Sequence, residues 1–339
     1  MEKADQLTID IFKNSNESTT YKIKSENGEG VMTLYSILIG IDLVYNDFHM
    51  GSYFTGSDPL NDVHLGTADR VIEINHCREG RYECQLKNDS YVYLEKGDLA
   101  INPYSNSSIY ESFPLSHYHG ISVIINIDKA KKAIEDISRA FGDFPINLEN
   151  LYNKLCTNES CFIARANDSI EHIFSEIYYV QDKVKLAYMK LKVLELLLFL
   201  EATDYNERHV EKLYYPKSVV ENVKRIKSYL VDNIDKRITL NELADKYNIP
   251  LTTMKACFKE IYGMPMYTYV RSARMTVASS LLLNTNDKIS YIAGKVGYEN
   301  PSKFSAAFKD VVGVTPASYR KNYKLNGVFR DDTEWKIFF

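Results

Sequence analysis

The spacing of hydrophobic positions changes once along the chain, near residue 128. Over residues 31–127, short runs rich in β-branched and aromatic residues alternate with turn signals at Glu79-Gly80, Asn88-Asp89 and Lys96-Gly97-Asp98. Such runs predict β-strands, here at residues 71–74, 82–86, 91–94 and 121–127. Several short strands at close spacing are typical of a sandwich or a small barrel. The first 30 residues are polar, and we expect them to be ordered only in part.

After residue 128 the hydrophobic period is that of a helix. One stripe is formed by Ala130, Ala133, Ile134 and Ile137, and another by Ile170, Ile173, Phe174 and Ile177. Residues 185–202 predict a strong helix whose second half is apolar almost all round, so a domain or a partner subunit must cover it on more than one side. Residues 204–216 are polar and end in a proline, which predicts a linker.

A fifty-residue internal repeat dominates the C-terminal third. The run FKEIYGM at 258–264 recurs as FKDVVGV at 308–314, and Met254 and Phe304 share the same offset. Upstream, Leu243-Ala244 corresponds to Ile292-Ala293 at an offset of forty-nine, so the second copy has gained one residue.

The first copy has the features of a helix-turn-helix. Residues 239–242 (TLNE) form a capping box, in which Thr239 and Glu242 cap each other's backbone amides. Ala244 allows two helices to cross closely, and Asn248 can adopt the left-handed conformation of a tight turn. Met254 and Phe258 would bury the second helix.

The second copy repeats these features with Ala293 and Gly297 at the crossing and the turn, and with Phe304 and Phe308 in the core. Asn300-Pro301 supplies an N-cap followed by proline at the first helical position. Between the copies, residues 267–283 predict a helix of roughly 25 Å. With its flanking turns, this length suits two recognition helices about 34 Å apart, in successive major grooves.

The segment from about Val219 to Arg320 resembles the AraC family of bacterial regulators. The matching residues are Ile226, Leu240, Leu243, Ala244, Phe258, Lys259, Gly263, Arg274, Ala278, Leu281, Leu282, Ile289, Ile292, Ala293, Val296, Gly297, Tyr298, Ser302, Lys303, Phe304, Phe308, Lys309, Gly313, Thr315, Pro316, Tyr319 and Arg320. The resemblance implies an all-α DNA-binding domain with two helix-turn-helix units joined by a long helix.

The resemblance also implies which positions contact double-stranded DNA, namely the exposed early turns of each recognition helix. The base-reading positions are Thr252, Lys255 and Ala256 in the first unit and Pro301, Ser302 and Ala306 in the second. Thr253 can also bond phosphate or base, and Lys255, Lys259, Lys303 and Lys309 are candidate phosphate contacts. Each lysine has an alternative interpretation as a merely solvated charge. Few of these side chains can read bases bidentately, so we expect backbone contacts and DNA shape to supply much of the affinity.

The charge distribution agrees with this assignment. Residues 217–323 hold 17 Lys and Arg against 9 Asp and Glu, a net of +8, whereas residues 1–216 hold 21 against 33, a net of −12. A basic C-terminal third joined to an acidic remainder fits a nucleic-acid binder whose other half does something else.

The resemblance implies an N-terminal sensor domain with a cupin-like β-barrel, followed by helices used in dimerisation. Arg81 and Glu83, which share one face of a strand, and His76 are candidate ligand-binding residues for an unknown small-molecule effector. Many of the 26 tyrosines fall in this half and could line a pocket, or could be ordinary strand residues.

Two alternatives stay open for the N-terminal half. A metal-dependent cupin enzyme would need a His-x-His pair, a Glu and a further His. His117 and His119 alternate on one strand, with His49, His64 and His76 upstream, but Glu111 precedes the pair and the full motif is absent. Structural histidines are the preferred interpretation. The other alternative is a ligand-independent regulator whose N-terminal half only dimerises or binds a protein.

The sequence therefore predicts an α+β protein: a polar segment at 1–30, a cupin-like β-barrel sensor at 31–127, a helical dimerisation region at 128–203, a linker at 204–216, the DNA-binding domain at 217–323 and a tail at 324–339. We expect a cytoplasmic homodimer, not an enzyme, that acts with RNA polymerase and has no catalytic residue, metal or cofactor. No apolar run reaches eighteen residues, no export signal begins the chain, and the five cysteines are an odd number, so neither a membrane span nor a disulfide framework is expected.

Overall fold

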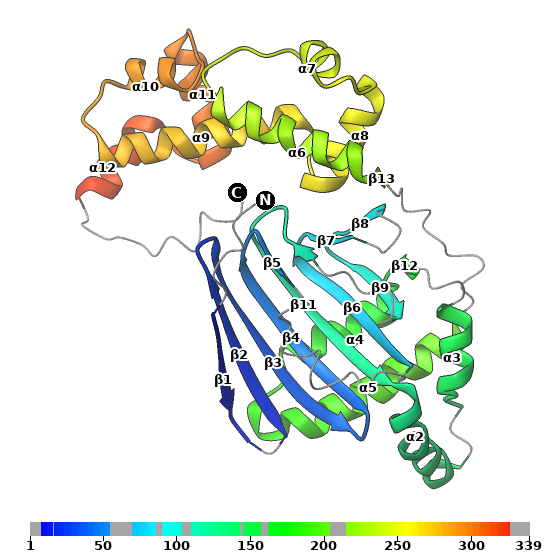
Figure 1. The fold of residues 1–339 in the computed structure, drawn as a ribbon. Helices are drawn as coiled ribbons and strands as arrows, with labels where there is room; N and C mark the ends of the chain where they lie inside the picture. Colours follow the sequence, from blue (N-terminus) through cyan, green and yellow to red (C-terminus); the bar gives the residue numbers. More distant parts are fainter. Residues whose placement is uncertain are drawn as a thin grey trace. The chain divides into compact units, whose positions relative to one another are not determined.

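A computed structural model describes residues 8–15, 17–54, 70–85, 90–103, 110–142, 145–156, 162–203 and 215–325. The chain divides into two compact units, Met1–Tyr214 and Tyr215–Phe339. Figure 1 shows that the N-terminal unit is built around β-sheet with helices, and that the C-terminal unit is helical. The predicted mixed fold, with a sheet-based N-terminal half and a helical C-terminal half, is confirmed.

The larger sheet of the N-terminal unit is antiparallel throughout and has eight strands within the described residues. Its strand order is β1 (Thr8–Lys13), β2 (Ser18–Ser25), β3 (Gly28–Leu38), β4 (Ile41–Met50), β11 (Tyr118–Asn126), β6 (Val71–Gly80), β9 (Asp98–Pro103) and β12 (Phe162–Arg165). A smaller antiparallel sheet has the order β8 (Ser90–Leu94), β7 (Tyr82–Gln85), β10 (Tyr110–Ser112) and β5 (Ser52–Phe54).

Strand β6 shows how the two faces of the larger sheet differ. Ile72 and Ile74 belong to a core shared with the helices, whereas Val71 and Cys77 belong to a core shared with the smaller sheet. Because successive strand residues point to opposite faces, one strand supplies both cores. The strand ends at Gly80, which has a left-handed φ of 83°. A Cβ atom at this position would lie 2.1 Å from the carbonyl oxygen of His117, so both the backbone conformation and the available space require glycine.

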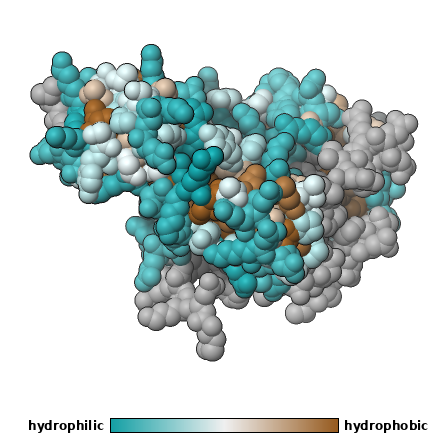
Figure 2. Space-filling model, turned by 90° about the horizontal axis from the view of Figure 1, so that it is seen from above, coloured by the Kyte–Doolittle hydropathy of each residue, from teal (hydrophilic) through white to brown (hydrophobic). Residues whose placement is uncertain are grey.

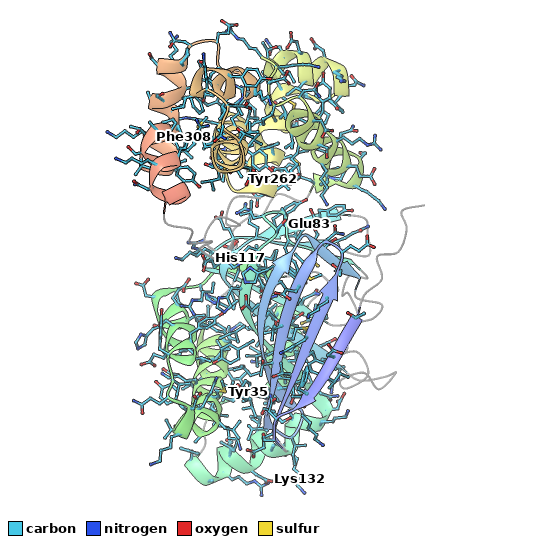
Figure 3. The ribbon with its side chains drawn as sticks, turned by 90° about the vertical axis from the view of Figure 1, so that its left-hand side faces the viewer. Tyr35, Glu83, His117, Lys132, Tyr262 and Phe308 are labelled. Carbon is cyan, nitrogen blue, oxygen red and sulfur yellow. The ribbon has the colours of Figure 1, made fainter. Side chains whose placement is uncertain are left out.

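Helices cover one face of the larger sheet. They are α2 (Ile127–Phe141), α3 (Leu148–Leu155), α4 (Asp168–Tyr178), the 3₁₀ turn η4 (Asp182–Val184) and α5 (Lys185–Ala202). Figure 3 shows Tyr35 between the sheet and the helices and Lys132 on the outer side of α2. The Tyr45 hydroxyl donates to the carbonyl oxygen of Ile177 at 2.7 Å, which ties the end of α4 to β4.

The helical patterns are confirmed, and the strand boundaries need two corrections. All four predicted stripe residues of α4 are buried, and α5 has the predicted bounds. The first 30 residues, however, form β1 and β2 where they are described, because their alternating Tyr21 and Ile23 join the core between the sheets. Strand β12 lies inside the region that we expected to be helical, where it pairs with the edge strand β9.

The C-terminal unit begins with the short strand β13 (Tyr215–Pro216) and continues with helices through residue 325. These are α6 (Lys217–Asp232), α7 (Leu240–Tyr247), α8 (Leu251–Tyr262), α9 (Met266–Asn284), α10 (Ile289–Lys295), α11 (Pro301–Val312) and α12 (Pro316–Leu325). In Figure 1 the α7–α8 pair lies at one end of this unit and the α10–α11 pair at the other, with α9 between them. Among the described helices of the chain, none has the length and hydropathy that a membrane span requires.

Candidate functional site

Helices α7 and α8 form the first of two similar helix pairs. The predicted capping box is confirmed: Thr239 Oγ1 accepts from the Glu242 amide at 3.3 Å, and Glu242 Oε2 accepts from the Thr239 amide at 2.7 Å. The backbone hydrogen bonds hold the Glu242 carboxylate in its charged form, so its pKa lies below its ordinary value. The box therefore fixes where α7 begins.

The turn between α7 and α8 depends on Asn248. This residue is left-handed, with φ 50° and ψ 49°, as predicted from its place in the repeat. The chain then turns back, and the Ile249 amide donates to the Ala244 carbonyl oxygen at 3.1 Å. Met254 and Phe258 are fully buried beneath α8, so this helix exposes only its opposite face.

Helices α10 and α11 repeat this arrangement. Gly297 takes the left-handed turn position with φ 77°, and the Tyr298 amide donates to the Ala293 carbonyl oxygen at 2.9 Å. Asn300 Oδ1 then accepts from the amides of Ser302 and Lys303 at 2.8 and 3.2 Å, with Pro301 at the first helical position. The predicted N-cap is confirmed, and Phe304 and Phe308 are fully buried.

Arg274, on α9, links the two pairs. Its Nε and Nη2 donate to the carbonyl oxygens of Ile234 and Lys236, each at 2.9 Å, just before α7. Its Nη1 donates to the Gly297 carbonyl oxygen at 3.4 Å, in the turn of the second pair. A second bridge joins α9 to α11, where Arg271 Nη2 donates to Asp310 Oδ2 at 2.5 Å. Guanidinium forks satisfy several carbonyls at once, so these contacts hold both pairs against α9.

A sequence model of a helix-turn-helix domain family matches residues 243–322, which run from within α7 to α12 and so contain most of the first pair and all of the second. Residues 243–322 form a helix-turn-helix domain. The curated relatives agree over this part of the chain. An uncharacterized helix-turn-helix transcriptional regulator, YisR of Bacillus subtilis, is 34% identical over 93 residues, which are 27% of this chain and 32% of that protein. The chain thus spans about a third of the length of that relative.

A longer but weaker similarity extends into the N-terminal unit. The transcriptional activator AggR of Escherichia coli is 21% identical over 261 residues, which cover 77% of this chain and 90% of that protein. Among solved structures, the C-terminal domain of AraT, a response regulator from Geobacillus stearothermophilus, is 31% identical over 30% of this chain and 84% of that chain, with a TM-score of 0.29. YisR is named as a transcriptional regulator and AggR as a transcriptional activator, which supports the resemblance to AraC-type regulators.

The helix-turn-helix domain places the sequence-derived DNA positions on the exposed sides of α8 and α11. Thr253 is half-buried, and the others are exposed: Thr252, Lys255, Ala256, Lys259, Pro301, Ser302, Lys303, Ala306 and Lys309. The two sets therefore occupy equivalent faces of the two second helices. The face of the molecule in Figure 2 is mostly hydrophilic, with hydrophobic residues in small separate patches.

The four lysines of these helices are available for phosphate. Within the described ranges, Lys255, Lys259, Lys303 and Lys309 form no ion pair, whereas Lys295 of α10 approaches Asp287 at 3.7 Å. Lysines without an acidic partner retain their full attraction for an anionic backbone. Chemically, this surface can bind polyanions and approach base edges with small side chains.

In the N-terminal unit, the structure places the three candidate ligand residues apart from its small pocket. His76 points to the helix-covered face of β6, where its ring stacks on Phe174 at 4.2 Å and its Nε2 lies 3.3 Å from Glu171 Oε2. Arg81 is buried and donates to Glu95 at 2.9 Å. Glu83 is buried and accepts from the Tyr93 hydroxyl at 2.8 Å.

The pocket lies between the two sheets, on the opposite face of β6 and β7. It has a volume of about 330 Å³ including its mouth, and its polar lining residues are Glu73, Asn75 and Asn102. Sequence reasoning missed these residues because polar positions that alternate within a strand usually indicate a solvent-facing side. On β7 the pocket is lined by Tyr82 and Cys84, which are the sequence neighbours of the predicted ligand residues Arg81 and Glu83.

The histidine pair of β11 takes part in ring contacts. The His117 and His49 rings are tilted relative to each other with centroids 5.0 Å apart, and His119 meets Tyr178 edge to face at 5.2 Å. Burial lowers the pKa of both His117 and His119, so it favours their neutral form. In the part of the chain that the structure describes, no group of three or more His, Cys, Asp or Glu side chains is arranged to hold a metal ion. His64 lies outside the described residues, as does the side chain of Glu111.

Proposed function

We propose that this protein is a sequence-specific, DNA-binding transcription regulator of the AraC type. The observation that carries the proposal is the duplicated helix pair, in which α8 and α11 present equivalent exposed faces with unpaired lysines. Thr252, Lys255 and Ala256 of the first unit, and Pro301, Ser302 and Ala306 of the second, contact base edges. Lys259, Lys303 and Lys309 contact phosphates, and Thr253 bonds phosphate or base.

The two helix-turn-helix units read adjacent major grooves. Helix α9 has 19 residues, and at 1.5 Å per residue it spans about 28 Å. With its flanking turns it matches the roughly 34 Å that separates successive major grooves on one face of DNA. The bridges from Arg274 and Arg271 support this role, because they stabilise the positions of both pairs relative to α9.

The N-terminal unit acts as a cupin-like sensor whose small-molecule effector shifts a two-state equilibrium of the regulator. The pocket between the two sheets supports this part of the proposal. The shift alters the affinity for DNA or the contact with RNA polymerase. The helical layer mediates a homodimer. An exposed apolar side chain on α5 supports this role, because Leu191 is 60% exposed in the single chain.

The test is binding of the full-length protein to DNA upstream of its own gene, measured by fluorescence anisotropy across a salt series with a scrambled competitor. Preference for the upstream DNA, with affinity that falls steeply with salt, is expected. Absence of binding to any DNA at low salt would contradict the proposal. Sedimentation of the wild type beside Leu191→Asp tests the homodimer, and the variant is expected to sediment as a monomer.

A further inference from the structure

The pocket between the sheets has one polar wall and one apolar wall. Glu73 and Asn75 come from the inward face of β6, and Asn102 comes from β9. The apolar lining includes Val92 and Leu94 of β8 with Ile163 of β12. The pocket is small and partly open to solvent at its mouth, so only a small ligand fits it.

The polar wall offers one buried acceptor without a donor, the side-chain oxygen of Asn102. Asn102 is 9% exposed, and its Oδ1 is buried with no hydrogen-bond partner. Buried side-chain oxygens are almost always hydrogen-bonded, so this acceptor is a position at which a ligand in the pocket can supply the missing donor. Asn75 differs, because its Oδ1 already accepts from the buried Tyr118 hydroxyl at 2.5 Å. Burial raises the pKa of Tyr118 well above its ordinary value, which keeps this hydroxyl a donor.

Glu73 gives the pocket its charge. It has the only formally charged side chain among the described lining residues. Glu73 and Asn102 are directly opposite each other on the antiparallel pair β6–β9, a register in which Cβ atoms stand about 5 Å apart. A single ammonium group has three N–H donors, so it can serve the Glu73 carboxylate and Asn102 Oδ1 together. A carboxylate or phosphate would instead meet a like charge and a second acceptor.

We propose that this pocket binds a small organic amine, with its ammonium group between Glu73 and Asn102 and its short alkyl or aryl part against Val92, Leu94 and Ile163. The inference rests on the proposed sensor function and adds the chemical class of the effector. Binding of an amine would also explain why Glu73 and Asn75 of β6 face the pocket between the sheets and not solvent.

The test uses the full-length protein and two matched probe series, n-butylamine with 1-butanol and butyrate, and benzylamine with benzyl alcohol and benzoate. Thermal shift and isothermal titration are expected to show at least tenfold tighter binding of an amine than of its alcohol, with no binding of the carboxylate. Glu73→Gln is expected to remove this preference, whereas Glu135→Gln, an exposed carboxylate on α2, is expected to leave it unchanged.

Equal or tighter binding of a carboxylate would overturn the proposal, and so would the absence of amine binding at millimolar concentration. Both results come from the wild-type protein, so they do not depend on how well Glu73→Gln folds. DNA binding is measured in parallel without any probe. Intact DNA binding without amine binding would overturn the ligand class alone, whereas loss of both would also contradict the regulator.

Discussion

The guanidinium group of Arg274 occupies the space in which a side chain on Gly297 would stand. An ideal Cβ on Gly297 would lie 2.7 Å from Arg274 Nη2 and 2.8 Å from the carbonyl oxygen of Asp235. The two residues are also hydrogen-bonded, and the Arg274 guanidinium lies over the Tyr298 ring, 5.6 Å from its centroid. The turn of the second helix pair is thus packed against the contact that links it to the first.

Replacing Gly297 with alanine is therefore expected to destabilise the helix-turn-helix domain by roughly 1–3 kcal/mol. The left-handed backbone alone costs an alanine about 1–2 kcal/mol, and displacement of Arg274 adds to this. Denaturant unfolding measures the difference. Gly294→Ala is the matched control, because a Cβ there meets nothing within 4 Å and the residue is inside α10, so this variant should be as stable as the wild type or more stable. Equal stability of the two variants would contradict the packing argument.

Arg274→Ala is expected to cost about 2–4 kcal/mol, because it leaves carbonyl oxygens on both sides of α9 without their charged donors. Arg225→Ala is the control: Arg225 is on α6, and its one described hydrogen bond is a 3.4 Å contact with Asn222. Urea unfolding of both variants tests this comparison. If Arg274→Ala lost no more stability than Arg225→Ala, Arg274 would not hold the two pairs together.

The start of α7 depends on the Thr239 hydroxyl. Thr239→Ala removes the side-chain acceptor for the Glu242 amide and is expected to lower the free energy of unfolding by about 1 kcal/mol. Thr239→Ser keeps the hydroxyl and should retain most of the stability. The two variants are compared by chemical denaturation at neutral pH, and an equal loss in both would show that the methyl group matters rather than the cap.

The other half of the capping box gives a pH dependence. Hydrogen bonds from Thr239 lower the pKa of Glu242 below its ordinary value of 4.5. A lowered folded-state pKa contributes stability that is present above pH 4.5 and is lost as the pH falls through the folded-state value. The stability difference between the wild type and Glu242→Gln should therefore be constant near neutral pH and shrink below pH 4.5. A difference that grew on acidification would contradict this assignment.

The sequence was informative where a local pattern determines the structure. The capping box at Thr239, the left-handed Asn248 and the cap at Asn300 are each formed by neighbouring residues, so their spacing predicted them. The pocket could not be found in this way. Glu73 lines it because β6 is covered on both faces, and His76 is excluded from it by the two-residue period of the same strand. Packing between segments that are distant in the sequence decides which face of a strand is buried.

The exposed alanines of the two recognition helices provide a test of the DNA-facing surface. Ala306→Glu places a negative charge on the exposed side of α11 without touching the core, so we expect at least a tenfold loss of DNA affinity with unchanged thermal stability. Ala140→Glu makes the same change at an exposed position of α2 in the N-terminal unit. Anisotropy titrations should show wild-type DNA affinity for Ala140→Glu. An equal loss of DNA affinity in both variants would show that the exposed side of α11 does not contact DNA.

The salt dependence of binding identifies individual phosphate contacts. Each lysine that neutralises a phosphate contributes about 0.9 to the slope of log affinity against log salt, because it releases condensed counterions. Lys303→Ala should therefore weaken binding to every DNA sequence alike and reduce the slope by about 1, as should Lys259→Ala on α8. Lys132→Ala, on the outer side of α2, should change neither quantity. If the slope fell for Lys259→Ala but not for Lys303→Ala, the second helix-turn-helix unit would lack its predicted phosphate contact, and the two-groove arrangement would fail.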